Sequence, residues 1–434
     1  MRATSARRVA LGALLRVTEH GGYSNLVVPA ALGRSGLREP DRRFAAELVY
    51  GTLRRLIPID RMLSAVVDRP LRRTPRDALA VLRLGAYQLA FTRVPSHAAV
   101  SETVALATAR DRGFVNAVLR RLAAEPPARP TGTSDEDVAV RTGLSGWAVA
   151  ELRHVLGGEE TEAAAMALAE RAPLTIRANT CALSADELAA RLSSAGIATR
   201  RGSLSRDSLT VGDAMIPSEL PGFADGLFAI QDEASAFVVQ TLSVRPGDHV
   251  LDACAAPGGK SGHLACLVGG DGSIVAADVS PGRAGLVRDQ LRRLGLRGLV
   301  VAQDARAPAV RGPFDAALVD APCSGIGSAR RRPELLWRVP RERLSALARL
   351  QVAIASATVG LLRPGGRLVY SVCTFPRAET DAACDTLLRH RPELVPEPID
   401  GPDGSAERVR LWPHRHGTDG MFVAAFRKAA EGGG

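Results

Sequence analysis

The sequence predicts a multidomain protein with an all-α N-terminal domain, a small α+β linking domain and a doubly wound, Rossmann-like α/β domain. Three observations support this division. The chain has 434 residues, which exceeds the usual size of one domain. Helical periodicity dominates up to a proline-rich break at 125–130, and strands alternate with helices from about residue 216. We therefore expect domains at residues 1–128, 129–215 and 216–434.

The N-terminal domain is expected to be helical. Its clearest helix, Arg76–Phe91, follows Pro75 and carries apolar residues at helical spacing. Further helices are expected at Ser101–Ala109, with Ser101 as the N-cap, and at Phe114–Leu122. The proline-rich run Glu125-Pro-Pro-Ala-Arg-Pro130 then interrupts the helical pattern, so it predicts a linker.

After the linker the pattern becomes mixed and then alternating. Residues 131–215 combine a helix near Ala163–Arg171 with short extended pieces such as Leu174–Ala178. From residue 216, helices expected at Gly282–Leu294 and Arg341–Leu362 separate apolar strands. This alternation predicts a largely parallel sheet, whose ligands bind beyond the carboxyl ends of the strands. The expected strands are His249–Ala255, Ser273–Val279, Leu299–Gln303, Phe314–Val319, Arg367–Val372 and Met421–Phe426.

The positive charge of the chain is concentrated at its N-terminal end. The net charge is +10, and residues 1–128 carry 21 Arg against 10 Asp and Glu, a balance of 21 − 10 = +11. Such an excess is expected of a domain that meets a polyanion such as RNA, although a solvated basic surface without a partner fits the charge equally well. No apolar run is long enough for a membrane helix, so we expect a cytoplasmic monomer without a membrane partner.

The six cysteines form no CxxC pair and are spread along the chain. Neither a disulfide framework nor a metal site is therefore expected. Cys181, Cys266 and Cys384 are interpreted as small buried hydrophobic residues.

A glycine-containing loop follows the first strand of the α/β domain and is the expected cofactor site. It reads Asp252-Ala-Cys-Ala-Ala-Pro-Gly-Gly-Lys260, and its small residues allow a tight turn and a close ligand approach. The chain has 56 basic residues, of which only Lys260 and Lys428 are lysines. This suggests that an arginine guanidinium cannot replace the ammonium of Lys260 at this site. The expected binding residues of the loop are Cys254, Ala255, Ala256, Pro257, Gly258, Gly259 and Lys260.

Two aspartates after the next strands complete this expected cofactor site. Asp278 ends the second strand, where a carboxylate commonly grips ribose hydroxyls. Asp304 ends the third strand after Gln303, where an adenine amino group is expected. The loop is neither a dinucleotide fingerprint nor a phosphate-binding P-loop, which favours a nucleoside ligand without phosphate. A small-residue turn with surface aspartates is the alternative.

Two cysteines follow the fourth and fifth parallel strands. One lies in Leu318-Val-Asp-Ala-Pro-Cys-Ser-Gly325 and the other in Val369-Tyr-Ser-Val-Cys-Thr374. Both are expected at the cofactor edge of the sheet, with Asp320 beside Cys323. Position alone does not decide which of Cys323 and Cys373 reacts.

With these segments, the chain resembles the RNA cytosine-5 methyltransferases of the RsmB/Sun family. The α/β domain carries the resemblance in DACAAPGGK at 252–260, VDAPCSGIG at 319–327, RRRPELLW at 330–337 and YSVCT at 370–374. The N-terminal half is similar to a NusB-like RNA-binding domain in RLGAYQLAF at 83–91, PSHAAVSETVALA at 95–107 and GFVNAVLRRL at 113–122. The resemblance implies a class I methyltransferase domain, S-adenosyl-L-methionine as cofactor and 16S ribosomal RNA as partner.

The resemblance also implies the roles of the site residues. Cys373 attacks C6 of the cytosine, Cys323 assists product release, and Asp320 interacts with N3 of the base and with the cofactor. A proton-donating Asp320 would need a raised pKa. The basic run Arg330–Arg332 is expected either to contact RNA phosphates or to form a solvated surface. Val372, Ile326 and Thr380 depart from the common pattern of the family without removing a reacting group.

Two other functions fit parts of the sequence. One is a NusB-like antitermination factor with a non-catalytic methyltransferase domain, but such a domain would be expected to have lost Cys373, Asp320 or Lys260. The other is a cytosine-5 methyltransferase of transfer RNA. The NusB-like resemblance favours ribosomal RNA.

Overall fold

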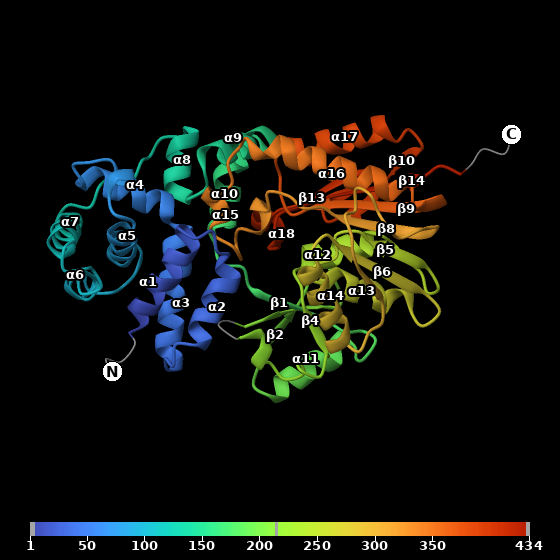
Figure 1. Ribbon diagram of the computed structural model, residues 1–434, viewed down its shortest axis with the longest axis horizontal. Helices are drawn as coiled ribbons and strands as arrows, with labels where there is room; N and C mark the ends of the chain where they lie inside the picture. Colours follow the sequence, from blue (N-terminus) through green and yellow to red (C-terminus); the bar gives the residue numbers. More distant parts are fainter. Residues whose placement is uncertain (1–4, 213–215, 431–434) are drawn as a thin grey trace. The chain divides into compact units, whose positions relative to one another are not determined.

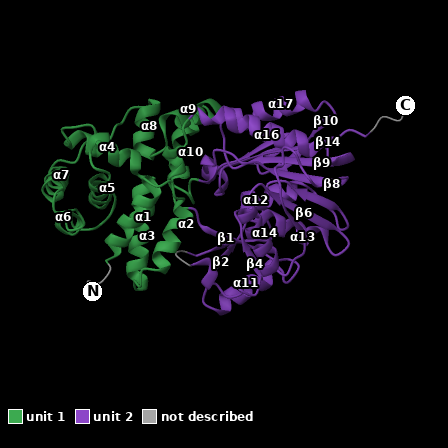
Figure 2. Ribbon diagram, in the orientation of Figure 1, with its two compact units in different colours: residues 1–171, 329–340 green, residues 172–328, 341–434 purple. Residues whose placement is uncertain are grey.

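The computed structural model describes residues 5–212 and 216–430. Packing divides the chain into two compact units (Figure 2), residues 1–171 with 329–340 and residues 172–328 with 341–434. The chain thus leaves the second unit after Ser328, joins the first for twelve residues and returns at Arg341. The division into domains at 128 and 215 stays a prediction. Among the described residues, no helix is long and apolar enough to cross a membrane.

Seven α-helices build the N-terminal part of the first unit (Figure 1) around a core that includes Leu14, Leu48, Leu82 and Leu119. The expected helix Arg76–Phe91 is present with these bounds. The helix expected at Ser101–Ala109 instead runs over Ser96–Val104 after Pro95, so Ser101 is not its N-cap. The helices are α1 Ala6–Thr18, α2 Ser24–Gly33, α3 Glu39–Arg54, α4 Leu56–Val66, α5 Arg76–Phe91, α6 Ser96–Val104 and α7 Arg112–Ala124.

Three more helices, α8 Asp135–Thr142, α9 Gly146–Leu156 and α10 Gly158–Ala169, complete the first unit together with the segment 329–340. That segment contains the short helix α15, Leu335–Arg338, and is held by hydrogen bonds within the unit. The indole Nε1 of Trp337 donates to the carbonyl of Leu53 at 2.9 Å, and the backbone N–H of Ser24 donates to the Glu334 carboxylate at 3.0 Å.

The second unit contains a small antiparallel sheet in the order β2-β3-β1-β4 (Figure 1). Its strands are β1 Leu174–Ala178, β2 Thr199–Arg201, β3 Ser208–Val211 and β4 Phe228–Ile230. The helix α11, Ala185–Ser194, starts with a capping box between Ser184 and Glu187 and packs Leu188 and Leu192 against this sheet. A small α+β element is therefore present, as the mixed sequence pattern predicts.

A larger mixed sheet follows, in the order β10-β14-β9-β8-β5-β6-β7, with β13 paired to β14. Strands β5 to β9 are parallel, and β10, β13 and β14 are antiparallel. The parallel strands are β5 His249–Asp252, β6 Ser273–Asp278, β7 Leu299–Ala302, β8 Phe314–Asp320 and β9 Leu362–Val372. The antiparallel strands are β10 Leu394–Glu397, β13 Arg408–Leu411 and β14 Met421–Lys428.

Helices cover both faces of the large sheet. Neighbouring strand residues point to opposite sides, so Val250 joins one hydrophobic core and Leu251 the other. The first core contains α12 Glu233–Thr241, α13 Gly259–Val268 and α14 Pro281–Arg293, and the second contains α16 Arg343–Val359 and α17 Asp381–His390 (Figure 1). The predicted doubly wound architecture is confirmed.

The cysteine interpretation needs a correction. Cys181 and Cys266, 85 residues apart in the sequence, form a disulfide that joins the loop after β1 to α13. Cys181 is exposed and Cys266 is half-buried, so neither is a buried hydrophobic residue. The two cysteines pair because the fold brings their Cα atoms to within 5.7 Å of each other. Their spacing in the sequence does not predict this pairing. Cys384 is 1% exposed on α17, as expected.

Candidate active site

The parallel strands bring the predicted site residues to one edge of the large sheet. Asp252, Asp278 and Asp320 are the last residues of β5, β6 and β8. Cys373 comes directly after β9, and Cys323 comes three residues after β8. Because parallel strands end at the same edge, residues from four separate segments meet there.

The loop between β5 and α13 makes a tight turn at this edge. Its Ala256–Pro257 peptide bond is cis, and Gly258 has a φ of +105°, which L side chains rarely adopt. A Cβ atom at Gly258 would lie 3.0 Å from the Cα of Val287, so α14 leaves no room for a side chain there. The glycine is therefore required for the course of the loop and for its packing on α14.

Asp278 and Asp304 both have partners within the protein. The Asp278 carboxylate is 4% exposed, accepts the backbone N–H of Ala256 at 3.3 Å and pairs with Arg283 at 3.1 Å. Asp304 lies two residues beyond β7 and binds Arg306, whose hydrogen bond lowers the pKa of Asp304 to about 2. Gln303 accepts the backbone N–H groups of residues 309 and 310, so its carbonyl oxygen shapes the loop.

Asp252 is a candidate binding residue that the sequence reasoning missed. Its side chain is 1% exposed, and Ser261 donates to Oδ2 at 2.7 Å, but the buried Oδ1 has no hydrogen-bond partner. Burial raises the pKa of Asp252 to about 6. A buried, unpaired carboxylate oxygen beside a loop of small residues fits a ligand that carries hydroxyl or ammonium donors. The position of Asp252 at the end of a predicted strand is the sequence feature that could have indicated this role.

The Asp252→Asn substitution should separate stability from ligand binding. Because the pKa of Asp252 is raised in the folded state, protonation of Asp252 stabilises the fold below pH 3.8. This stabilisation is lost as the pH rises through 6. Above that pH the buried side chain is a carboxylate and destabilises the folded state. At pH 8 we expect a higher melting temperature for Asp252→Asn than for the wild type, with weaker binding in calorimetry of the cofactor that the sequence implies, S-adenosyl-L-methionine. An unchanged cofactor affinity would contradict a binding role for Asp252.

Lys260 and Asp320 form a tight ion pair at the centre of the edge. The Lys260 Nζ atom lies 2.6 Å from Asp320 Oδ2, and Ser371 donates to Oδ1 at 2.9 Å. Burial alone would lower the pKa of Lys260, but the charge of Asp320 and its hydrogen bond outweigh burial and raise it. The Lys260 ammonium therefore keeps its charge and donates this hydrogen bond to Asp320 Oδ2.

The two cysteines predicted at this edge are neighbours. Their sulfur atoms lie 3.5 Å apart, and both side chains are half-buried. The hydrogen bond to Cys373, burial and the charge of Cys373 together raise the pKa of Cys323 well above its usual value. Lys260 also interacts electrostatically with Cys373. Cys323 is therefore held as the neutral thiol, next to Cys373 and to the charge of the Lys260 ammonium.

Backbone contacts set the spacing of the two cysteine loops. The N–H of Gly327 donates to the carbonyl of Cys373 at 3.0 Å, and the N–H of Gly420 donates to the carbonyl of Gly327 at 2.8 Å. A Cβ atom at Gly327 would lie 2.1 Å from the Gly420 carbonyl oxygen and 2.9 Å from that of Cys373. Only glycine permits this close approach.

Glu379, a further residue that the sequence reasoning missed, holds the same two loops together through its hydrogen bonds. It is fully buried and accepts the backbone N–H of Ser324 at 2.8 Å and the Ser324 hydroxyl at 2.5 Å. Gln351 donates to the same carboxylate at 2.9 Å, and the hydroxyls of Ser324 and Thr374 lie 2.6 Å apart. Glu379 therefore acts as a positioning residue for Cys323 and Cys373, each of which is next to a residue of this network.

The Glu379→Gln substitution tests this positioning role. The amide keeps the shape of the side chain but cannot accept from three donors at once, so the two loops should lose their fixed spacing. We expect kcat to fall about 10- to 100-fold with little change in the KM for RNA, because small misplacements of reacting groups are costly. Glu233→Gln is the control, since Glu233 is also buried and accepts a backbone N–H, that of Leu204 at 2.8 Å. Equal activity losses in the two variants would contradict the role.

The basic run Arg330–Arg332 and the histidine beside the cofactor loop, His263, are largely shielded from solvent. Arg330 is only 8% exposed, so it is neither a solvated surface residue nor an open contact for RNA phosphates, while Arg331 and Arg332 are half-buried. His263 is 1% exposed, and burial holds its pKa well below the usual value. Among the residues that the structure describes, no group of three or more His, Cys, Asp or Glu side chains is placed to hold a metal ion.

Comparison with known proteins agrees with this geometry. The model of the family described as 16S rRNA methyltransferase RsmB/F matches residues 239–427. The NusB family model matches residues 4–124, and the ferredoxin-like domain model of the RsmF/B-like methyltransferases matches residues 144–216. Ribosomal RNA small subunit methyltransferase B of Vibrio cholerae is 33% identical over 98% of each chain. The chain belongs to the RsmB/F methyltransferase family.

Further relatives of this RsmB/F family member also match it over nearly their full length. Ribosomal RNA small subunit methyltransferase B of Pseudomonas putida is 34% identical over 98% of each chain. Among solved structures, that of PH0851 is 25% identical, covers 98% of each chain and has a TM-score of 0.86. A methyltransferase homologue from Pyrococcus horikoshii is 29% identical over 68% of this chain and 99% of its own, with a TM-score of 0.59. The predicted NusB-like, small α+β and methyltransferase folds are thus confirmed.

Proposed function

We propose that this RsmB/F family member transfers a methyl group from S-adenosyl-L-methionine to C5 of a cytosine in small-subunit ribosomal RNA. The observation that carries the proposal is the pair of cysteine sulfurs 3.5 Å apart beside the Lys260–Asp320 ion pair. The small-subunit names of the full-length relatives favour ribosomal RNA over transfer RNA. The intact set of reacting groups speaks against a purely RNA-binding, non-catalytic protein.

The residues of the loop edge fit the cofactor. Asp252 offers an unpaired buried oxygen, and the small residues of 253–259 leave the backbone accessible. Asp278, at the end of β6, is the residue that we assign to the ribose hydroxyls, after release from Arg283. Asp304 is assigned to the adenosine end of the site, although it now pairs with Arg306. When bound, the cofactor supplies an electrophilic methyl group on a sulfonium.

Cytosine C5 is a poor nucleophile, and the cysteine pair provides a way to activate it. The target base first leaves its stack and enters the site. The Cys373 thiolate then adds to C6, while N3 takes the proton of the 2.6 Å hydrogen bond from Lys260 to Asp320. The ring becomes an enamine whose C5 carries the electron density needed to accept the methyl group. Asp320 is therefore the residue assigned to N3.

Product release requires loss of the C5 proton and of the sulfur at C6, and Cys323 is suited to take that proton. Its raised pKa comes first from the hydrogen bond to Cys373 and also from the charge of Cys373. Once Cys373 is a thioether, that sulfur bears no charge, so Cys323 ionises more easily and becomes a base. It removes the C5 proton, the electron pair re-forms the C5–C6 double bond, and the Cys373 thiolate leaves while N3 returns its proton.

Mapping 5-methylcytosine in RNA from cells with and without this protein tests the proposal. At least one cytosine in small-subunit ribosomal RNA should lose its methyl group when the gene is deleted and regain it with the wild-type protein. Re-expression of Cys373→Ala should leave that cytosine unmethylated. If methylation is lost at a transfer RNA position instead and ribosomal RNA is unchanged, the substrate is transfer RNA and the proposal is wrong.

A further inference from the structure

The first unit contains a cavity of about 340 Å³ that is remote in sequence from every residue of the proposed catalytic site. Its floor is apolar and is formed by Met62 of α4, Phe91 at the end of α5 and Met166 of α10. The linker 127–130 closes one side. This volume lies within the range of small-molecule sites.

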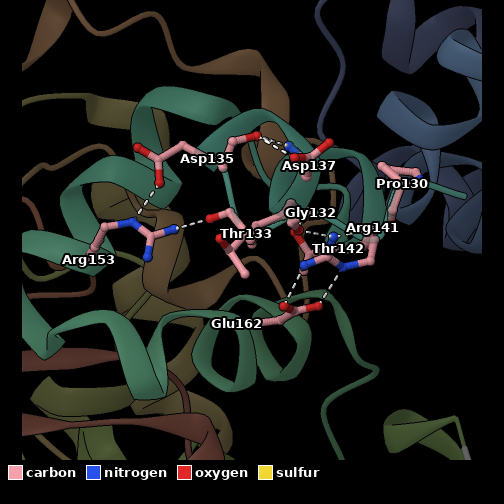
Figure 3. A network of polar contacts seen from close by, with 11 residues as sticks. Pro130, Gly132, Thr133, Asp135, Asp137, Arg141, Thr142, Arg153 and Glu162 are labelled. Atoms are coloured by element: carbon pink, nitrogen blue, oxygen red, sulfur yellow. Dashed lines mark hydrogen bonds and ion pairs between the residues drawn. The ribbon is translucent and has the colours of Figure 1, made fainter.

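A network of polar contacts fixes the wall of this cavity (Figure 3). Arg141 of α8 makes two hydrogen bonds to the Glu162 carboxylate, at 2.7 and 2.6 Å. The same guanidinium donates to the linker carbonyls of Pro130 at 3.1 Å and Gly132 at 2.7 Å. The linker is therefore held against α8 and α10, so the cavity has a defined shape.

The rim of the cavity carries a local excess of positive charge. Four arginines line it, namely Arg55, Arg61, Arg129 and Arg141, against one acid, Glu162. Arg141 occupies both oxygens of Glu162. Within the described part of the chain, Arg61 and Arg129 have no carboxylate partner within 4.0 Å.

Two of these cations are held close together. The guanidinium carbons of Arg55 and Arg129 lie 5.7 and 5.4 Å from the centre of the Phe91 ring. Burial lowers the pKa of Arg55, and the charge of Arg129 lowers it further. Like charges over one ring disfavour each other, so an anion that binds Arg129 also relieves its repulsion with Arg55.

We propose that this cavity binds one nucleotide of the RNA substrate. The base lies on the apolar floor against Met62 and Met166, and its phosphate pairs with Arg61 and Arg129. Apolar side chains beside guanidinium groups match a nucleobase and its phosphate. The +11 balance of residues 1–128 favours a polyanion over a free nucleotide. The proposal rests on the proposed RNA substrate and adds a second anchoring point, formed by residues other than those of the catalytic site.

The test measures RNA affinity and methylation kinetics of the full chain, using a labelled single-stranded segment of small-subunit ribosomal RNA. Arg61→Ala/Arg129→Ala should weaken binding at least about tenfold and reduce the slope of log K against log salt by about 0.7, as expected when one phosphate is no longer neutralised. Arg34→Ala/Arg110→Ala is the control, because both arginines are exposed and lie outside the cavity lining. An equal loss in both double variants would overturn the proposal.

A second variant tests the cavity without changing charge. Ala65 lines it and is exposed, so Ala65→Trp should fill the space without disturbing a core. This variant should weaken RNA binding at least about tenfold with an unchanged salt slope, because no phosphate contact is removed. Wild-type affinity in Ala65→Trp would show that no base enters the cavity. The affinity of the wild-type protein for adenosine monophosphate is measured as well. If the protein binds adenosine monophosphate as tightly as the RNA segment, the assignment of the cavity to RNA is overturned.

Kinetics distinguish this proposal from the proposed function. With saturating RNA, Arg61→Ala/Arg129→Ala should keep the wild-type kcat and show a raised KM for RNA. A wild-type KM in an active double variant contradicts the cavity proposal alone. Absence of RNA methylation by the wild-type protein contradicts the function itself.

Discussion

Cys323→Ala is expected to accumulate a covalent protein–RNA species that survives denaturing electrophoresis. In this variant Cys373 still adds to C6 and the methyl group still transfers, but the base that we assign to C5 proton removal is missing. The adduct therefore forms and breaks down slowly. Because general-base assistance contributes about 10²- to 10⁴-fold, turnover should fall by a similar factor while the first methyl transfer persists.

Cys373→Ala is the matched variant and should behave in the opposite way. It removes the nucleophile 3.5 Å from Cys323, so no bond to cytosine forms and methylation stops. The double variant should also form no adduct, because trapping requires attack first. If Cys373→Ala accumulates the adduct and Cys323→Ala does not, the roles of the two cysteines are exchanged.

Lys260→Arg should reduce kcat by about 10²- to 10⁴-fold although the charge is kept. The Lys260 side chain is 13% exposed and its Nζ approaches Asp320 to 2.6 Å, a site that fits a compact ammonium. A guanidinium is larger and planar, and it is a weaker acid than an ammonium. It should therefore displace Asp320 and deliver a proton to N3 of the cytosine adduct much less readily.

The other lysine supplies the control for this substitution. Lys428 lies at the end of β14 and donates to the backbone carbonyls of Val359 and Leu362. Lys428→Arg should retain the wild-type kcat, measured by methyl transfer to RNA at saturating substrate. Wild-type activity in Lys260→Arg would remove this proton transfer from the mechanism.

Much of the fold follows from hydrophobic periodicity. The helix Arg76–Phe91 and the strand Leu174–Ala178 have the predicted bounds, because each combines a clear apolar pattern with a flanking breaker. The helix Ser96–Val104 was predicted five residues too late, since Pro95 rather than Ser101 precedes its first turn. The Cys181–Cys266 disulfide was missed because it depends on how the small sheet meets α13, which local patterns do not encode.

The site was predictable where its residues end strands and lie in recognisable segments. The strand ends bring together Asp320, Cys323 and Cys373 as expected, because parallel strands share one edge. The network around Glu379 was not predictable, since its hydrogen bonds join residues 28 and 55 positions apart. The pairing of Lys260 with Asp320 across 60 positions likewise requires the folded sheet.

The most direct test of the proposed chemistry uses RNA in which 5-fluorocytidine replaces cytidine. Fluorine at C5 does not leave as a proton does, so the adduct formed after methyl transfer cannot break down. We expect the wild-type protein, incubated with this RNA and S-adenosyl-L-methionine, to form a stable complex. After nuclease and protease digestion, mass spectrometry should find the methylated fluorocytosine on the peptide that contains Cys373. Attachment at Cys323, or no attachment in a protein that methylates unmodified RNA, would contradict catalysis through a Cys373 adduct.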